Sequence, residues 1–264
     1  MARSFDGGRS FVRPAQIVTH IVSTGIPDFT GDSTFDGQAG ARDGSFPTVD
    51  IANGTPTGAD ATDEIVLAWS EGPTPSDIHP GPNERVNVMT STNGGDSWTA
   101  SGLASPASDR PDFPAIAISP NGTDAYLTYM NFLQPWQSDN TAPRVFGGVV
   151  RHADVSPTGA IGAWSDIHRA PTGDARGSSA NALIDEFLGD YDYAFATRAG
   201  VVAVWNDARN AADCPAIDAY RDQVANGTAA GDSTDPTRPA PQQQCPANFG
   251  NTNIYGGSYA DPTP

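Results

Sequence analysis

A hairpin pattern that occurs three times is the feature that most constrains the fold of this chain. Each copy starts with a short, partly apolar segment, passes through a Gly-containing turn and continues into a strand that ends in an aromatic residue. The first segments are F-P-T-V-D-I-A at 46–52, F-P-A-I-A-I-S at 113–119 and Y-D-Y-A-F-A-T at 191–197. The second strands of the hairpins lie at 65–69, 125–129 and 201–205 and end in Trp69, Tyr129 and Trp205. A third strand follows each hairpin, at 85–90, 144–150 and 253–259. Short strands in a fixed order predict repeated antiparallel sheets.

The composition agrees with an all-β protein. With 28 Gly and 23 Pro among 264 residues and only 17% charged residues, the chain has the turn formers that many short strands need. No stretch of helical periodicity rivals the alternating segments. One domain spanning 1–264 is the expected count for an all-β chain of this length. A fixed strand order closed by aromatics fits a β-propeller better than a sandwich.

Two polar turns share one residue pattern. They are S-F-D-G-G-R-S-F at 4–11 and S-T-N-G-G-D-S-W at 91–98. In each, a short polar side chain can cap the turn through its own backbone, and Gly supplies a positive φ. The positions that carry the pattern are Ser4, Asp6, Gly8 and Phe11 in the first turn and Ser91, Asn93, Gly95 and Trp98 in the second. We expect the terminal aromatic to fold back into the apolar layer; the alternative for one copy alone is an ordinary Gly-Gly hairpin.

Both turns resemble the Asp-box, or BNR repeat, of sialidase-like β-propellers. Four further stretches, at 110–122, 173–179, 186–194 and 204–221, are similar to the C-terminal half of secreted actinobacterial proteins of the exo-α-sialidase type. The resemblance implies four-stranded blades in a six-bladed ring, and this chain would supply a partial propeller of about three to four blades. A longer chain or a second copy would supply the remaining blades. It also implies a secreted or cell-surface protein that binds a glycan or glycoprotein.

The predicted blades follow the repeats along the chain. We expect residues 1–45 to form the outer strand of a blade, at 11–22, plus a linker. Blades are expected at 46–105, 106–172 and 186–264, the last with an insertion at 207–248. Because the chain starts near an outer strand and ends after a third strand, its two ends could complete one blade.

The resemblance also implies a set of catalytic and binding groups. Sialidases hold the substrate carboxylate with arginines, whose planar forks match it, and they use a Tyr nucleophile beside a Glu, with an Asp as acid and base. The candidate substrate-binding residues in this chain are Arg42, Arg110, Arg176 and Arg209. The alternative is that each is a solvated loop arginine or pairs with one of the 31 acidic residues. The family's F/Y-R-I-P motif is absent, which counts against catalysis.

The densest group of candidate catalytic residues is Glu186, Asp190, Tyr191, Asp192 and Tyr193. On a strand, Asp190 and Asp192 would point to one face and the two tyrosines to the other. We assign Glu186, Asp190 and Tyr191 as the catalytic candidates at the rim; the alternative is strand-entry packing with solvent-facing carboxylates. These residues leave three functions open: glycan recognition with exo-α-sialidase-type hydrolysis, a non-catalytic carbohydrate- or protein-binding propeller, and a purely structural cell-surface module.

Charge and hydropathy exclude two classes of partner. The formal net charge of −17 and the pI of about 4.2 provide no basic patch for nucleic acid. No apolar run approaches the roughly 20 residues that cross a bilayer, so we expect no membrane insertion.

Cysteines and metal ligands give weaker indications. Cys214 and Cys245 flank a stretch without hydrophobic pattern, so an exported protein would join them in a disulfide; two free thiols are the alternative. Acidic and Asn-rich loops make Ca²⁺ a candidate ligand, but no EF-hand spacing assigns a position. The four histidines show no zinc-type spacing and are expected at the surface or in packing positions.

Overall fold

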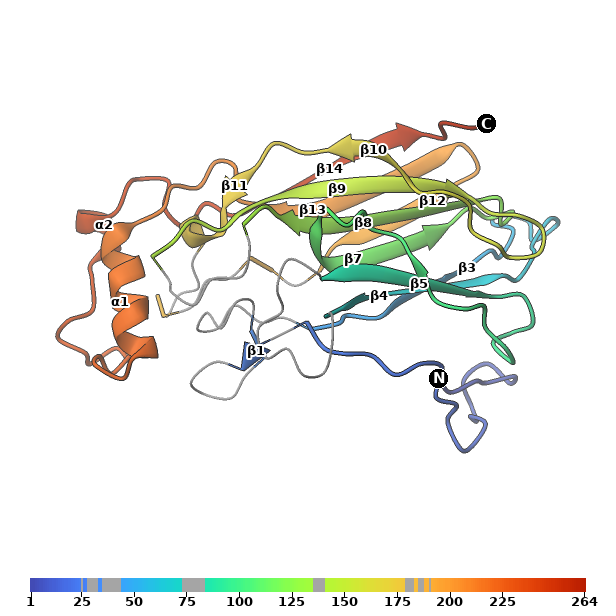
Figure 1. Cartoon of the computed structure of the whole chain (residues 1–264), viewed down its shortest axis with the longest axis horizontal. Helices are drawn as coiled ribbons and strands as arrows, with labels where there is room; N and C mark the ends of the chain where they lie inside the picture. The colour runs from blue at the N-terminus through green and yellow to red at the C-terminus, as the bar shows by residue number, and fades with distance from the viewer. Residues whose placement is uncertain are drawn as a thin grey trace.

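Three antiparallel sheets follow one another along the chain in the computed structural model (Figure 1). The structure describes residues 1–24, 26–27, 33–34, 44–72, 84–134, 141–178, 183–184, 188–189 and 191–264. A two-stranded ribbon, β1 (Ile26–Pro27) and β2 (Ser33–Thr34), precedes the three sheets. The prediction of an all-β protein is confirmed.

The first sheet has the order β3-β4-β5-β6 and the second β10-β9-β8-β7. The strands of the first are β3 (Thr48–Ile51), β4 (Ile65–Glu71), β5 (Arg85–Ser91) and β6 (Gly102–Leu103). Those of the second are β7 (Arg110–Ile118), β8 (Asp124–Phe132), β9 (Val145–Asp154) and β10 (Ser165–Arg169), with β11 (Gly173–Asp174) also paired to β9.

The third sheet has the order β12-β13-β14. Its strands are β12 (Tyr193–Thr197), β13 (Gly200–Asp207) and β14 (Asn253–Ala260). All nine strand segments predicted from the repeats therefore carry strands. Apart from β11, the strands of the three sheets lie inside the ranges 46–105, 106–172 and 186–264, and the identity of these ranges as propeller blades stays a prediction.

The sheets pack face to face in chain order. One core joins the first sheet, through Val66 and Val88, to Ile118 and Leu127 of the second. Another joins Tyr126 and Val150 of the second sheet to residues of the third, including Ala203 and Trp205. Strand β7 contacts both β3 and β12, so the first strands of the three sheets lie together. The described residues form an open stack and do not close a ring (Figure 1).

The three aromatics that end the second strands all lie in the core. Trp69, Tyr129 and Trp205 are at most 2% exposed. Trp205 lies directly against β9, because a Cβ placed on Gly148 would come within 2.5 Å of its ring atoms. Glycine is needed at 148 to let the third sheet approach the second this closely.

The two polar turns have the same hydrogen bonds. Ser4 Oγ accepts from Gly8 N at 2.8 Å, and Ser91 Oγ accepts from Gly95 N at 2.9 Å. In each turn the i+2 side chain accepts from a serine N–H at 2.9 Å, which is Ser10 for Asp6 and Ser97 for Asn93. The glycines have positive φ, as expected.

The aromatics after these turns behave differently from each other. Trp98 is half-buried, whereas Phe11 is 55% exposed, so the expected burial of the first aromatic is wrong. The N-terminal turn instead rests on the second turn: the Arg3 guanidinium pairs with Asp96 and donates to Gly94 O at 3.2 Å.

The N-terminal segment also departs from expectation. Residues 11–22 contain no strand. At the end of this segment, Val22 O accepts a hydrogen bond from Gly72 N at 3.0 Å. In the described part of the chain, β14 pairs with β13 alone. The two ends therefore do not complete one sheet.

The predicted insertion contains a helix that the sequence reading missed. Helix α1 (Pro215–Ala225) starts with Pro at its first turn and buries Ile217, Tyr220 and Val224 at helical spacing. Two shorter helical segments are η2 (Ala175–Gly177) and α2 (Pro241–Gln244). The predicted disulfide between Cys214 and Cys245 is present and joins the start of α1 to the end of α2.

No helix in the described ranges has both the length and the hydrophobicity needed to cross a bilayer.

Candidate functional site

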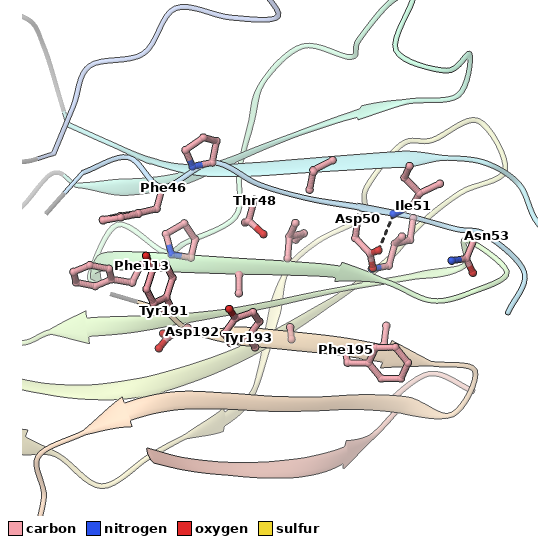
Figure 2. Close-up of a pocket in the computed structure, with 18 of the residues that line it drawn as sticks. Phe46, Thr48, Asp50, Ile51, Asn53, Phe113, Tyr191, Asp192, Tyr193 and Phe195 are labelled. Atoms are coloured by element: carbon pink, nitrogen blue, oxygen red, sulfur yellow. Dashed lines mark hydrogen bonds between the residues drawn. The ribbon is translucent and has the colours of Figure 1, made fainter. Parts of the chain in front are cut away.

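A cleft of about 480 Å³ lies between the first strands of the three sheets, β3, β7 and β12 (Figure 2). Each strand contributes the residues of its own copy of the repeated hairpin: 46–55, 113–120 and 191–196. Equivalent segments of the three sequence repeats therefore line one cleft. A concave site with many apolar groups and a few polar ones is the usual form of a small-molecule site.

Two phenylalanines at equivalent repeat positions form one end of the lining. Phe46 and Phe113 each precede a proline, and their ring centroids are 5.0 Å apart. Both have positive φ, 33° and 52°, which is unusual for a bulky residue and costs conformational energy. Both phenylalanine rings therefore line the cleft from residues whose backbone conformation is strained.

The segment that leads into β12, together with β12 itself, supplies three more aromatic side chains. Tyr191, Tyr193 and Phe195 are 68%, 65% and 65% exposed, and all three line the cleft. Asp192 and Ala196, the alternate residues, are buried. This is the strand alternation expected from the sequence. The tyrosines present an apolar ring together with a hydroxyl that can form hydrogen bonds.

Asp50 and Asp192 belong to the cleft segments, and backbone N–H groups donate to both carboxyls. Asp50 accepts from Ile51 N at 2.8 Å and from Ile118 N at 3.0 Å, which links β3 to β7. Burial raises the pKa of Asp192 well above its ordinary range, and a hydrogen bond from Asn206 N at 3.3 Å opposes that rise only in part. The Asp192 side chain is buried, on the opposite side of the 191–196 segment from the exposed tyrosines.

No arginine, lysine or histidine is among the described residues that line the cleft. The lining is aromatic and aliphatic with acidic and amide groups, in a protein of net charge −17. Such a surface repels an anionic ligand, and it has no guanidinium group that could bind a sugar carboxylate through two hydrogen bonds. An uncharged ligand with both apolar and hydroxyl faces fits it better.

The predicted catalytic and binding residues are only partly brought together. Tyr191 lies in the cleft. Arg42, Glu186 and Asp190 lie outside the described residues. Arg110, Arg176 and Arg209 are absent from the cleft lining, and carboxylates neutralise all three.

Arg110 and Arg209 each bind one carboxylate in a forked geometry. Arg110, 4% exposed, lies 2.9 Å through Nε from Glu84 Oε2 and donates through Nη2 to Oε1 at 3.3 Å. Arg209 donates through Nε to Asp207 Oδ1 at 2.8 Å, and its guanidinium carbon lies 4.0 Å from the ring centroid of Tyr255. These contacts stabilise the fold.

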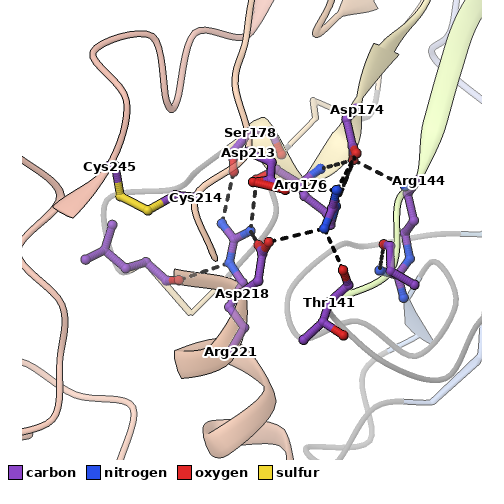
Figure 3. Close-up of polar contacts among 12 residues, drawn as sticks. Thr141, Arg144, Asp174, Arg176, Ser178, Asp213, Cys214, Asp218, Arg221 and Cys245 are labelled. Carbon is purple, nitrogen blue, oxygen red and sulfur yellow. Dashed lines mark hydrogen bonds and ion pairs between the residues drawn. A yellow bond between two sulfur atoms is a disulfide. The ribbon is translucent and has the colours of Figure 1, made fainter. Parts of the chain in front are cut away.

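Arg176 is the centre of a larger ion network (Figure 3). Its guanidinium lies 2.8 Å from Asp174, 2.9 Å from Asp213 and 3.4 Å from Asp218. Burial by itself would lower the pKa of Arg176, but the hydrogen bond and charge of Asp174 and the charges of the other two carboxylates raise it above its ordinary value. The network connects η2 with the start of α1.

Arg221 completes this network from α1 by binding carbonyl groups. It is 1% exposed and donates to Leu183 O at 3.1 Å, Ser178 O at 2.9 Å and Arg176 O at 3.3 Å. Together the two arginines attach the disulfide-bonded insertion to the second sheet. This is a structural role, and it accounts for Arg176 without a ligand.

The sequence reading missed several cleft residues that had a visible signal. Phe46, Asp50 and Phe113 belong to the repeated segments used there only to locate strands, and Phe195 follows the tyrosines at strand spacing. Aromatics at the same repeat position of successive sheets indicate a shared surface, and that pattern was available in the sequence.

Comparisons with known proteins give little support of their own. No protein-family model matches the chain, and no curated protein matches it. Among solved structures it is similar to a mutant of Trypanosoma rangeli sialidase displaying trans-sialidase activity, with 11% identity and a TM-score of 0.28. The match covers 75% of this chain and 33% of that one, so the chain spans about a third of the neighbour's length. The family of this chain is therefore not shown by similarity.

Proposed function

We propose that this chain is part of a sialidase-like, Asp-box β-propeller that is exported and binds an uncharged glycan in the cleft between β3, β7 and β12. The observation that carries the proposal is the lining: five aromatic side chains from equivalent segments of three successive sheets meet there. Sugar rings have apolar C–H faces that stack on aromatics and hydroxyls that accept or donate hydrogen bonds. Asp50, Asn53, the tyrosine hydroxyls and the hydroxyls of Thr48 and Thr55 are polar partners in the described lining.

Two further observations support the architecture and the compartment. The identical hydrogen bonds of the turns at Ser4 and Ser91 are those expected of two copies of one capped turn. The Cys214–Cys245 disulfide is typical of proteins that fold in an oxidising compartment. The remaining blades would come from a longer chain or a second copy.

The proposal favours neutral sugars over sialic acid. A sialoside would bring its carboxylate into a described lining that has acidic groups and no cation. The three described candidate arginines already pair with carboxylates of the chain. Arg110 pairs with Glu84 and Arg209 with Asp207. Arg176 pairs with Asp174, Asp213 and Asp218.

A glycan array followed by calorimetric titration tests binding. We expect neutral glycans to bind and sialylated ones to bind more weakly. Phe195→Ala should weaken binding at least several-fold because it removes an exposed aromatic ring on which a sugar face would stack. Phe11→Ala is the matched control, since Phe11 is 55% exposed and does not line the cleft. Equal losses in both variants, or preferential binding of sialosides, would contradict the proposal.

Glycoside hydrolysis is the second candidate, favoured by the position of Tyr191. This predicted nucleophile is 68% exposed at the cleft. A panel of 4-methylumbelliferyl glycosides, including the sialoside, tests it. Turnover that is abolished by Tyr191→Phe supports a hydrolase, whereas glycan binding without turnover of any substrate supports a binding module.

A further inference from the structure

A histidine and three aspartates from two sheets meet at the ends of β8, β9 and β14. In the β8–β9 ladder, Asp124 is opposite Asp154 and Tyr126 is opposite His152. Residues two apart on a strand share a face, so these four side chains lie on one face in two consecutive pairs. Asp261 follows β14, where its N–H donates to Ala199 O at 2.9 Å. The group thus joins the second sheet to the third, and none of its members lines the cleft.

The carboxylate oxygens converge on one nitrogen of the histidine. His152 Nε2 lies 3.1 Å from Asp124 Oδ1, 3.6 Å from Asp261 Oδ1 and 3.9 Å from Asp154 Oδ1. One ligand atom each from Asp124, His152 and Asp261 lie within 4.8 Å of one another. Ligands bound at about 2.0–2.1 Å to a tetrahedral ion are roughly 3.3–3.5 Å apart. The separations of His152 Nε2 from Asp124 and Asp261, 3.1 and 3.6 Å, already lie close to this value.

Three members of the group are buried, whereas the Asp154 side chain is 66% exposed. His152 is 2% exposed, Asp124 6%, and the Asp261 side chain 9%. The two buried carboxylates, Asp124 and Asp261, face a single imidazole, so at most one of their charges is compensated within the buried set. Buried charges of one sign are costly unless a cation accompanies them.

An unpaired tyrosine hydroxyl points independently to a missing partner. Tyr126 is 1% exposed, its ring centroid is 5.1 Å from that of His152, and its hydroxyl has no hydrogen-bond partner among the described residues. Tyr126 lies on the same face of the β8–β9 ladder as Asp124, His152 and Asp154, because it is two residues from Asp124 and opposite His152. Buried polar groups are nearly always satisfied, so an unsatisfied one indicates an ion or a water at the site.

We propose that Asp124, His152 and Asp261, with Asp154 as the fourth ligand, form a binding site for a divalent transition metal, with Zn²⁺ the ion that best fits. Imidazole and carboxylate together suit Zn²⁺, whereas Ca²⁺ takes oxygen ligands alone. Hydrogen bonds from Thr123 to Asp124 and from Thr263 to Asp154 and Asp261 orient the carboxylates, as outer groups do in metal sites.

The bound ion would fasten the last strand of the third sheet to the β8–β9 ladder. Because β14 is held to β13, and β13 to β12, the same ion fixes the sheet that forms one wall of the cleft. The role is structural, and the sequence reading placed this histidine among surface or packing residues for lack of any local spacing.

Calorimetric titration of ZnCl₂ into untagged, chelator-treated protein tests the site, with the melting temperature followed in parallel. We expect one Zn²⁺ per chain and a rise in melting temperature, since an ion that binds only the folded state stabilises it. Asp261→Asn, a nearly isosteric change, and His152→Gln should each weaken binding by roughly tenfold or more. His20→Gln, at an exposed histidine outside the group, should leave binding unchanged.

Co²⁺ substitution adds a readout that separates ligation from folding. Visible absorption bands of tetrahedral Co²⁺ should appear with the unaltered protein and be lost in Asp261→Asn, whose far-UV spectrum should remain that of the folded chain. The proposal is overturned by folded, stripped protein that binds no Zn²⁺. It is also overturned by Zn²⁺ binding that Asp261→Asn leaves intact, or by binding of Ca²⁺ alone that His152→Gln does not affect.

Discussion

Replacing Glu64 by glutamine should remove a pH-dependent loss of stability that this buried carboxyl imposes. Glu64 precedes β4 and is 3% exposed, and its Oε1 has no hydrogen-bond partner among the described residues. It lies against the second sheet, because a Cβ on Gly159 would be 3.1 Å from that oxygen. Burial raises the pKa of Glu64 from 4.5 to about 7.

The direction of the effect follows from proton binding. Between pH 4.5 and about 7 the folded protein holds a proton on Glu64 that the unfolded chain has lost. The free energy of unfolding therefore falls as the pH rises through this window. The difference between the two pKa values corresponds to about 3 kcal/mol, fully expressed above pH 7 and absent below pH 4.5.

Urea denaturation of the parent and Glu64→Gln at several pH values from 4 to 8.5 measures this difference. We expect equal stability near pH 4 and a more stable variant at pH 8, by about 2–3 kcal/mol. Asp63→Asn, the same change at the exposed neighbouring residue, is the matched control and should be nearly neutral. A variant whose stability follows the same pH curve as the parent would refute the burial argument.

Three further changes test the packing of the sheets and the insertion. Gly148→Ala, whose Cβ would clash with the Trp205 ring, should cost about 1–3 kcal/mol in thermal or urea unfolding; an unchanged midpoint would show that the sheets do not meet there. Arg176→Met should cost about 3–5 kcal/mol because it leaves buried carboxylates unpaired, and a neutral result would remove its structural role. Replacing Cys214 and Cys245 by serine opens a loop of 31 residues and should cost about 3–4 kcal/mol; equal stability under oxidising conditions would argue against this link.

The strands were predictable because their signal is local. Partial alternation within 46–52, or a short apolar run such as 201–205, together with a flanking turn residue suffices to predict a strand. The helix α1 had a local signal too, since Ile217, Tyr220 and Val224 follow Pro215 at helical spacing. It was not predicted because it is short and lies in a polar stretch between Cys214 and Cys245.

The partners of buried charges were not predictable in the same way. That Arg176 meets Asp213 and Asp218 depends on how the insertion packs on η2. That His152 is opposite Tyr126 depends on the strand register. Such pairings join residues far apart in the chain, and no spacing rule contains them. For this reason arginines predicted to hold a substrate carboxylate are found bound to carboxylates of the chain itself.

Hydrogen exchange with and without a neutral glycan that binds the protein is the most direct test of the central claim. The account predicts slower exchange on binding in three separate segments, 46–53, 113–118 and 191–196, which share the cleft. Protection confined to the arginine network at 173–178 and 213–221, or spread evenly over the three sheets, would contradict it.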